Sequence, residues 1–528
     1  MAAAPRVPAP LPPHLARYVV AQDYSQYTPR DQAVWRHILR QLTRHLEHRA
    51  HPSYLRGLAA AGISVERIPS LEEMNLKLAA LGWSAVAVRG FIPPAVFTEL
   101  QSRSVLAIAA DIRSHEHIEY TPAPDIVHES AGHAPILADP RYAEYVRRCG
   151  VVGFKAIASR EDQAVYEAVR NLSVVKEDPD ATAEDGLRAE ARLQAARAAR
   201  TYVSESTRAS RLYWWTAEYG LVGPMERPRI YGAGLLSSTG EAVHCLGPEV
   251  TRRPLDLACV EQDFDITTMQ PALFVARDFE HLFEVLGAFE ATLAWKRGGD
   301  AGLVEALRAR TVNHLLLTGG LELTGRVARL IQGEPSAGLA TRLAVLEGPG
   351  QLSRGGTALG GPWHGQALVA FTPMPLPPEG PFTLRLGGDV ILTGVRAGAF
   401  GADRLQGTQR DRPLDLPTKA LLLVSAALPS VAGGPGDPEA WDQWFGGALA
   451  AEGEAESLAR RRKAEALAPG LAALYTEVRT QRETGPILPS RLAGILQELA
   501  RFPEDWLLRC EVQELLALAD TQRAVEPP

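Results

Sequence analysis

The stretch PDIVHESAGHAPILADP, from Pro124 to Pro140, carries two histidines five residues apart, with Glu129 directly after the first. The zinc-protease motif H-E-x-x-H spaces its histidines four residues apart, so that both reach one metal from one face of a helix. In a regular α-helix, five residues turn the second histidine about 140° away from the first. His128 and His133 can therefore share a metal only if the helix distorts or ends between them, and Gly132 is well placed for that.

Three features favour a metal site over two ordinary histidines, which would be the commoner interpretation of this spacing alone. Asp125, three residues before His128, could hold the outer ring nitrogen of that histidine. Prolines bracket the pair and would stiffen its ends. Glu218 lies in the aromatic stretch LYWWTAEYG, where a buried carboxylate is costly unless it is paired or binds a metal. Two histidines and one carboxylate form the facial triad of non-haem Fe(II) oxygenases.

The composition of the whole chain limits the kinds of function. Its 528 residues suggest two or three domains, and its formal charge of −7, without a long basic run, does not favour nucleic acid as a partner. Four widely separated cysteines suit a reducing compartment. The longest apolar run, residues 420–428, is too short to cross a bilayer, and the proline-rich start lacks the apolar core of a signal peptide. We therefore expect a cytoplasmic protein with no membrane partner.

Helix signals dominate the first part of the chain. Thr28 as N-cap, followed by Pro29 and by Asp31 in the first turn, predicts a helix start. Ser70 to Glu73 has the pattern of a second start, and a short strand is predicted at 84–89. Most of the chain from there to about residue 330 carries helical patterns.

The composition changes near residue 333, where glycine and proline become frequent. Stretches at 366–372 and 382–386 predict strands, and LGGDV at 386–390 predicts a tight hairpin turn. From Asp437 onward the chain is again rich in alanine, leucine, glutamate and arginine, which indicates helices. Because Gly/Pro-rich stretches often join domains, a domain boundary is expected near residue 333.

Several separated motifs resemble those of the tetrahydropterin-dependent aromatic amino acid hydroxylases, and among them the bacterial phenylalanine 4-monooxygenases with a long C-terminal extension. The motifs are, in order, Arg113, YTPAPDIVHESAGHAP (120–135), YWWTAEYGL (213–221), YGAGLLSSTGE (231–241) and MQPALFVARDF (269–279). The resemblance covers roughly residues 20–300. It implies the mainly α (α+β) catalytic fold of that family.

The resemblance and the local patterns together give a predicted division of the chain. It consists of a disordered arm at 1–15, the hydroxylase-type catalytic domain at 16–300, connecting helices at 301–335, a small β-rich domain of unknown role at 336–435 and a helical C-terminal region at 436–528. Within the catalytic domain, residues 176–206 depart from the family as a charged, alanine-rich insertion that we expect to be helical. Ser130 and Ala131 also replace bulkier residues that the family carries between its histidines.

The resemblance implies a role for each matched residue. His128, His133 and Glu218 would be the catalytic site and ligate Fe(II), and Arg113 would take the substrate carboxylate, a task suited to a planar, two-pronged donor. The other substrate positions are Thr121, Pro124, Trp214, Tyr219, Ser237 and Ile266, and the pterin positions are Gly90, Ile92, Phe97 and Glu129. Without the resemblance, Arg113 would be interpreted as a surface ion pair, and the aromatic residues as ordinary core.

The implied reaction is hydroxylation of the ring of a free aromatic amino acid. Fe(II), a tetrahydropterin (tetrahydrobiopterin or a related reduced pterin) and O2 would be required, so the implied partners are the small amino acid and the pterin. Ile266 matches a position that is apolar in phenylalanine-type members and acidic in tyrosine-type ones, which favours conversion of L-phenylalanine to L-tyrosine. Hydroxylation of tryptophan, or at another ring position, stays open.

Other classes of function stay open as well. The chain could be a metal-free scaffold derived from the family, although all three candidate ligands are intact. A zinc hydrolase is disfavoured by the histidine spacing. For the C-terminal region, packing or assembly into a homo-oligomer is the simplest role. Since every matched motif precedes residue 280, a fragment ending near residue 335 is expected to keep the activity.

Overall fold

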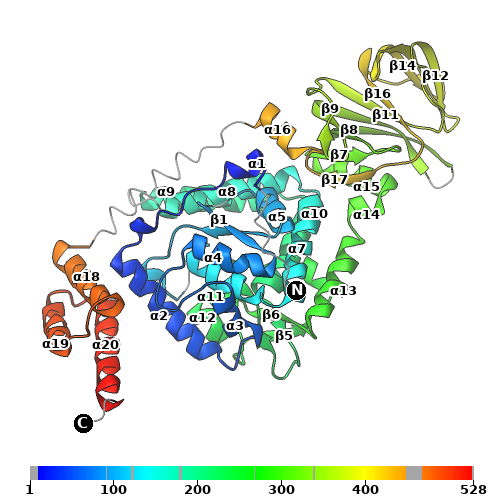
Figure 1. The fold of residues 1–528 in the computed structure, drawn as a ribbon. Coiled ribbons are helices and arrows are strands. Elements are labelled where there is room, and N and C mark those ends of the chain that lie inside the picture. Colours follow the sequence, from blue (N-terminus) through cyan, green and yellow to red (C-terminus); the bar gives the residue numbers. More distant parts are fainter. Residues whose placement is uncertain are drawn as a thin grey trace.

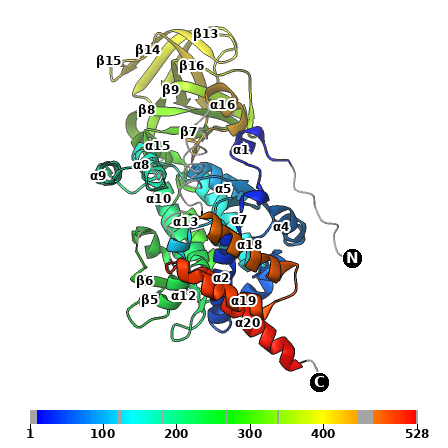
Figure 2. The ribbon, with the colours of Figure 1, turned by 90° about the vertical axis from the view of Figure 1, so that its left-hand side faces the viewer.

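The computed structural model describes residues 10–90, 92–119, 124–177, 181–266, 268–336, 339–446 and 467–525. A helix-rich part forms the centre of the molecule, a β-rich part lies at one end, and the C-terminal helices lie against the side of the centre (Figures 1 and 2). Both helices and a large sheet are therefore present, in the order that the sequence predicted.

The helix predicted after Thr28 is confirmed as α2 (Pro29–Leu46). The Thr28 side chain accepts from the backbone N–H of Asp31, and the Asp31 carboxylate accepts from that of Thr28, which completes a capping box. One face of α2 buries Trp35, Ile38 and other apolar side chains in the main core. This helix is the support on which both the centre and the C-terminal helices pack.

The other elements of the centre are mostly short helices around two small sheets. The helices are α1 (Pro13–Ala16), η1 (Tyr24–Gln26), α3 (Ser53–Ala60), α4 (Leu71–Leu78), η2 (Ala79–Leu81), α5 (Pro94–Ser102), η3 (His115–His117), η4 (Val127–His133), α6 (Ala134–Ile136), α7 (Pro140–Lys155), α8 (Arg160–Glu177), α9 (Ala183–Ala198), α10 (Glu205–Tyr213), η5 (Trp214–Glu218), α11 (Ala233–Ser237), α12 (Thr239–His244), η6 (Leu257–Glu261), α13 (Phe279–Glu290), α14 (Ala294–Arg297) and α15 (Gly299–Ala309). Strands β1 (Ser84–Val88) and β2 (Val105–Ala109) pair in parallel. Strands β3 (Leu221–Val222), β4 (Arg229–Ile230), β5 (Thr251–Pro254) and β6 (Ala272–Ala276) form a sheet in the order β4-β3-β6-β5.

The helical insertion predicted at 176–206 is confirmed as α9. This helix begins with a capping box between Thr182 and Asp185 and lies against α8. Val165, Ala168 and Leu193 form a small apolar cluster of their own between the two helices. Most other side chains of α9 are exposed, so the insertion adds a helix to the surface without entering the main core.

The start of the chain differs from the expected disordered arm. Residues 1–9 lie outside the described residues, but Pro13–Ala16 form helix α1. Leu15 is fully buried, and His14 is 8% exposed. The prediction is therefore wrong for residues 13–15, because contacts with distant segments order a stretch whose local sequence carries no helix signal.

The connecting helices expected at 301–335 are wrong beyond residue 309. Helix α15 ends at Ala309, and strands β7 (Val312–Leu316) and β8 (Leu321–Ser336) follow. Strand β8 pairs with β9 (Leu339–Arg354) through several register shifts. These bulges interrupt the alternation of apolar and polar side chains, so the stretch does not show the simple period of a strand.

The expected domain boundary near residue 333 is also wrong, because that residue lies within strand β8. Ser336 at the end of β8 pairs with Leu339 at the start of β9, so the Gly/Pro-rich residues 333–336 belong to one of two paired strands. Glycine is common both in β-hairpins and in linkers between domains, and composition alone did not separate the two.

The β-rich part is one large sheet with strands from 312 to 433. After β9 it contains β10 (Thr357–Ala358), β11 (Gln366–Phe371), β12 (Gly380–Leu386), β13 (Val390–Ala397), β14 (Gly401–Gln409), β15 (Arg412–Pro413), β16 (Lys419–Ser425) and β17 (Ser430–Gly433). Its main path is β12-β13-β14-β16-β11-β9-β8-β7-β17. The predicted strands and the hairpin are confirmed, since Leu386 pairs with Val390. The sheet meets the centre through α14 and α15.

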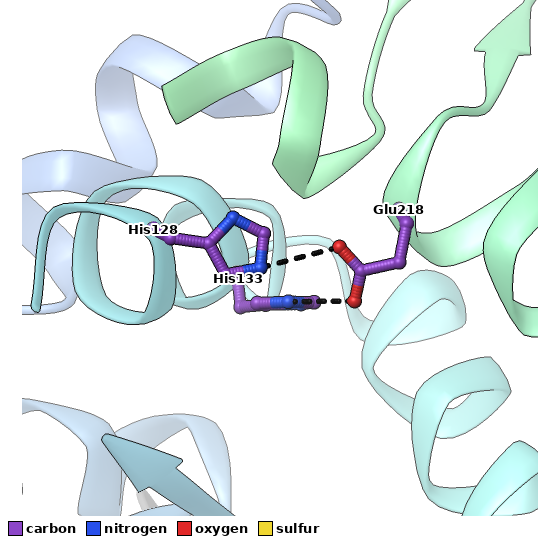
Figure 3. A group of neighbouring side chains, drawn as sticks. All are labelled: His128, His133 and Glu218. Atoms are coloured by element: carbon purple, nitrogen blue, oxygen red, sulfur yellow. Dashed lines mark ion pairs between the residues drawn. The ribbon is translucent and has the colours of Figure 1, made fainter. Parts of the chain in front are cut away.

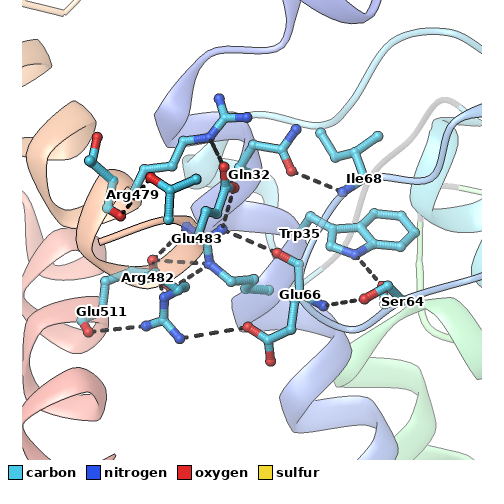
Figure 4. Close-up of polar contacts among 12 residues, drawn as sticks. Gln32, Trp35, Ser64, Glu66, Ile68, Arg479, Arg482, Glu483 and Glu511 are labelled. Carbon is cyan, nitrogen blue, oxygen red and sulfur yellow. Dashed lines mark hydrogen bonds and ion pairs between the residues drawn. The ribbon is translucent and has the colours of Figure 1, made fainter. Parts of the chain in front are cut away.

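The helical C-terminal region is confirmed as α16 (Pro438–Phe445), α18 (Pro469–Glu483), α19 (Pro489–Glu498), η7 (Leu499–Arg501) and α20 (Trp506–Val525). Helices α18 and α20 pack on α2, and their buried apolar side chains belong to the same core cluster as the centre. Figure 4 shows Glu66, Arg482 and Glu511 gathered at this contact. The Arg36 guanidinium, 1% exposed, donates to both carboxylate oxygens of Glu511. Among the described helices, none is long and apolar enough to cross a lipid bilayer.

Candidate metal centre

His128 and His133 come together because the segment that carries them is a π-helix. Element η4, from Val127 to His133, has this conformation. A π-helix closes its hydrogen bonds between residues five apart, so residues at that spacing follow one another on the same face. The expected distortion of the helix is therefore confirmed. Gly132 does not end the helix; a Cβ there would lie 2.6 Å from the carbonyl oxygen of Ala233, so glycine allows α11 to pack closely.

Glu218 reaches the two histidines from a second π-helix, η5, which continues α10. Its carboxylate points at both imidazole rings (Figure 3). The Oε2 atom lies 3.3 Å from His128 Nε2, and Oε1 lies 3.1 Å from His133 Nε2. In the described part of the chain, these three residues are the group of donors close enough together to hold a metal ion, with ligand atoms within 4.8 Å of one another.

The donor set fits an octahedral metal ion with an open face. Ligand atoms at about 2.1 Å from a metal and at right angles to each other lie about 3 Å apart, which is close to the two nitrogen–oxygen distances here. The Glu218 side chain is 12% exposed and that of His133 is 4% exposed. Burial alone would raise the pKa of Glu218, but the two histidines outweigh it and lower that pKa.

Ser237 holds the outer nitrogen of His128. Its hydroxyl donates to the carbonyl oxygen of Ala233 at 2.7 Å, so it is left to accept from His128 Nδ1 at 3.0 Å. This places the imidazole proton on Nδ1 and leaves Nε2 with a free lone pair. The expectation that Asp125 holds the ring is wrong. Its carboxylate accepts from the backbone N–H of His128 at 3.0 Å, as a residue just before a helix commonly does.

Arg113 is paired with Asp125 inside the protein. Its Nε donates to Asp125 Oδ2 at 2.8 Å, and its Nη2 donates to Oδ1 at 2.7 Å. The third arm, Nη1, donates to the carbonyl oxygen of Ser237 at 3.2 Å. Burial raises the pKa of Asp125, but Arg113 more than offsets it, so the net pKa is lowered. The side chains are 1% and 5% exposed, so the surface ion pair considered from sequence is wrong.

A stack of aromatic rings lies next to the cluster. Trp214 stacks on Tyr219 at 4.4 Å between ring centres, and on Phe264 at 4.2 Å with an angle of 8°. The sequence pointed to Trp214 and Tyr219 but missed Phe264, although it lies two residues before Ile266 in the loop already singled out. Ile266 itself is half-buried. The arrangement offers flat apolar surface beside the three candidate metal ligands.

Tyr213 connects the histidines to the residues expected to hold the pterin. Its ring stacks on that of His133 at 6.4 Å and meets the edge of Phe97 at 5.9 Å. Its hydroxyl accepts from Gln101. The sequence missed both Tyr213 and Gln101, because only the fold brings α5 and α10 side by side with η4.

The other residues expected to hold the pterin come from the segments around β1, α5 and η4. Gly90 follows β1 with a φ of +61°, a conformation that favours glycine. Ile92 and Phe97 pack against Leu100 and Val88 in one apolar cluster. Glu129 is buried, with its carboxylate 3.9 Å from His133 Nε2. Burial is the main cause that raises the pKa of Glu129, to about 8.

Two of the predicted substrate residues, Thr121 and Pro124, stay untested. Thr121 lies outside the described residues, and Pro124 is described but exposed. Their roles stay predictions.

The model of a family described as biopterin-dependent aromatic amino acid hydroxylases matches residues 18–174 and 196–297. The gap between the two ranges falls on the predicted insertion. The chain is 30% identical over 274 residues to phenylalanine-4-hydroxylase of Pseudomonas aeruginosa, covering 52% of this chain and 87% of the relative. With phenylalanine-4-hydroxylase of Caulobacter vibrioides it shares 29% over 330 residues, 60% of this chain and 97% of the relative.

Solved structures of phenylalanine hydroxylase from Chromobacterium violaceum are also similar. One of them contains iron(III) and 7,8-dihydrobiopterin; it is 27% identical and covers 52% of this chain and 85% of that chain, with a TM-score of 0.42.

Proposed function

Because this chain belongs to the family of biopterin-dependent aromatic amino acid hydroxylases, we propose that it hydroxylates the ring of free L-phenylalanine to give L-tyrosine, with Fe(II), a tetrahydropterin and O2. The observation that carries the proposal is the buried cluster of His128, His133 and Glu218, whose donor atoms lie within 4.8 Å of one another. The names of the relatives support phenylalanine as the substrate and the para position of its ring as the site of hydroxylation.

Two imidazoles and one carboxylate suit Fe(II), and they leave coordination positions open for small molecules. Bound iron, together with a reduced pterin and O2, would supply the oxidising chemistry that amino acid side chains lack. The chain's own residues supply the rest. Ser237 fixes the tautomer of His128, and the two π-helices aim all three ligands at one point. Partial burial of the cluster limits its contact with bulk water.

Arg113 supports recognition of an amino acid carboxylate. Its pair with Asp125 fixes the plane of the guanidinium through two arms, and Nη1 is the arm left for a substrate oxygen. In this proposal Nη1 breaks its hydrogen bond to the Ser237 carbonyl oxygen when the substrate carboxylate binds. The stack of Trp214, Tyr219 and Phe264 would then receive the aromatic ring.

The pterin is proposed to lie on the other side of the cluster, against Phe97, Ile92 and Gly90, with Glu129 near its polar edge. Phe97 presents a partly buried ring on α5, and Tyr213 joins it to His133. An aromatic ring that is partly exposed offers a stacking surface for a flat heterocycle.

A single experiment tests the proposal. The full-length protein is loaded with Fe(II) under anaerobic conditions, and tetrahydrobiopterin, air and a panel of aromatic amino acids are added. Metal content is measured, and products are separated by ring position. We expect one iron per chain and tyrosine from phenylalanine. Product only from tryptophan, or a different ring position, would correct the substrate; iron binding without any hydroxylated product would reject the activity; and a chain that binds zinc but no iron would reject the site.

A further inference from the structure

His14, near the start of the described chain, is held between two carboxylates from distant elements. Its Nε2 lies 2.9 Å from Glu99 Oε2 on α5, and its Nδ1 lies 2.8 Å from Glu439 Oε2 on α16. Its backbone N–H also donates to Glu439 Oε2 at 2.9 Å. Figure 1 shows α1 between the centre and α16. The side chains of His14 and Glu99 are 9% and 6% exposed, so their contact is shielded from water, whereas that of Glu439 is 27% exposed.

The two contacts require a particular state of the imidazole. A neutral ring donates from one nitrogen only, whereas both nitrogens here face carboxylate oxygens, so the ring must be the doubly protonated cation. Burial disfavours that cation, but hydrogen bonds to Glu99 and Glu439 outweigh burial and raise the pKa of His14. Other charged groups on the neighbouring elements face this contact. Arg103 pairs with Glu99, and Arg17 pairs with Asp442.

The segment that carries His14 packs directly beneath the proposed pterin side of the site. Leu11 and Leu15 belong to the same small apolar cluster as Ile92 and Phe97. Farther on, the backbone N–H of Val20 donates to the carbonyl oxygen of Ala87 at 2.9 Å, which ties the segment to β1. The strand that leads to Gly90 and the helix that carries Phe97 are thus both in contact with residues 10–20.

Helix α16 is itself anchored to the β-rich part. Gln351 on β9 donates to the carbonyl oxygen of Asp437 at 3.0 Å and accepts from its backbone N–H at 2.7 Å. The Asp437 carboxylate accepts from the backbone N–H of Ala358 at 2.8 Å. A continuous set of contacts therefore runs from the β-rich sheet through Glu439 and His14 to α5.

The family match begins at residue 18 and ends at residue 297, so neither His14 nor Glu439 lies within it. We propose that His14 is a positioning residue that clasps α1 and α16 onto α5, and so holds Phe97 and Ile92 where the pterin stacks. The proposal rests on the proposed function for the identity of the ligand. It gives the C-terminal extension a part in the reaction through α16, without any contact with substrate.

The clasp acts on the pterin side alone. Glu99 lies two residues after Phe97 on a helix of nine residues, so anchoring Glu99 limits how far the Phe97 ring can turn or shift. The substrate residues Arg113 and Trp214 come from other elements. Arg113 pairs with Asp125, and Trp214 stacks on Tyr219 and Phe264. Loss of the clasp is therefore expected to weaken pterin binding and leave the amino acid side nearly unchanged.

The test compares His14→Gln, Glu439→Gln and the double variant with the unmodified full-length protein. Each single variant is expected to raise the KM for tetrahydrobiopterin, and the Kd for 7,8-dihydrobiopterin measured by calorimetry, about five- to tenfold, the size of the net contribution of one typical hydrogen bond. The KM for phenylalanine should change less than about twofold. The double variant should be no worse than His14→Gln alone, because His14→Gln already removes the contact with Glu439.

A matched control and a second readout separate the outcomes. His37→Gln replaces a half-buried histidine on α2, away from the clasp, and should leave pterin binding unchanged. The protection factors of the amide hydrogens of residues 94–102, which correct for the intrinsic effect of pH on exchange, should fall in the clasp variants. In the unmodified chain they should fall as pH rises through the raised pKa of His14. Unchanged pterin constants in variants that exchange faster would overturn the positioning role. An unmodified chain that binds no pterin would instead reject the proposed function, and the pterin role of the clasp with it.

Discussion

His133 follows His128 by five positions, and this one-residue difference from a zinc-protease helix changes which structure can hold a shared metal. In an α-helix the two rings would point to different sides, whereas in a π-helix they follow one another on one face. Glu218 then completes the set, with both carboxylate oxygens within 3.3 Å of a histidine nitrogen. At this scale the identity of each atom matters, so conservative substitutions are informative.

Replacing Glu218 with glutamine tests the ligand set. The amide has nearly the same shape but is neutral and binds iron poorly. We expect Glu218→Gln to fold with an unchanged melting temperature, to lose most of its bound iron and to form no hydroxylated amino acid. Iron content by mass spectrometry and product by chromatography decide the outcome; full iron with normal turnover would mean that Glu218 is not a ligand.

Replacing Arg113 with lysine tests the carboxylate site. Lysine keeps the charge but cannot hold both oxygens of Asp125 while presenting a further donor to substrate. We expect the KM for phenylalanine to rise by at least about tenfold, the size of one lost charged hydrogen bond, with iron content unchanged. Steady-state kinetics on iron-loaded protein provide the measurement. An unaltered KM would restrict Arg113 to the buried pair with Asp125.

At the scale of elements, the site depends on how closely η4 and α11 approach. Gly132 lets the two backbones meet, and Ser237 at the end of α11 then reaches the ring of His128. The same contact explains why a π-helix persists here: its neighbours hold it, although π-helices are rare. The strands β8 and β9 are a second case of irregular backbone held by a neighbour. Their bulges persist because the two strands pair with each other.

Gly132→Ala should disturb this approach. A Cβ would lie 2.6 Å from the Ala233 carbonyl oxygen, so one of the two elements must shift. We expect a loss of about 1–3 kcal/mol in the free energy of unfolding and weaker iron binding. Gly186→Ala is the matched control, because a Cβ there meets nothing within 4 Å in helix α9 and should be neutral or stabilise slightly. Urea denaturation gives the free energy of unfolding of both variants, and their iron content is measured alongside. Equal values for the two variants would mean that the close approach of η4 and α11 is unimportant.

For the whole molecule, the C-terminal helices are part of the main core and do not form a separate appendage. Arg36 on α2 is 1% exposed and depends on Glu511 from α20 for its charge partner. A fragment ending near residue 335 would lose that partner, separate β8 from β9 and uncover the apolar face that α18 and α20 bury. The structure therefore argues against the expectation that such a fragment works independently.

Glu511→Gln tests this integration without truncation. It leaves the buried Arg36 beside a neutral amide, and breaking a buried pair typically costs about 3–5 kcal/mol. Glu73→Gln is the matched control, since its carboxylate is 49% exposed and pairs with Arg67 at the surface, where a loss of less than about 1 kcal/mol is expected. Chemical denaturation gives both values. Equal small losses would mean that the C-terminal helices contribute little to the stability of the centre.

The sequence by itself determined the parts that depend on local chemistry and on ordered motifs. Thr28 and Asp31 predict the start of α2, LGGDV predicts the hairpin between β12 and β13, and the separated motifs predict the hydroxylase family. The two histidines and Glu218 were also found in this way, because their residue types and setting are unusual enough to suggest a shared metal.

Only the tertiary structure decided what depends on contacts between distant segments. Ser237, not Asp125, holds the ring of His128, and Tyr213 and Phe264 join the site from elements that the sequence could not place together. The same holds for His14 and Glu439, which are 425 residues apart in the chain yet share a hydrogen bond. Local patterns report the preferences of a few neighbouring residues, whereas these contacts arise from the packing of whole elements, which no short stretch of sequence encodes.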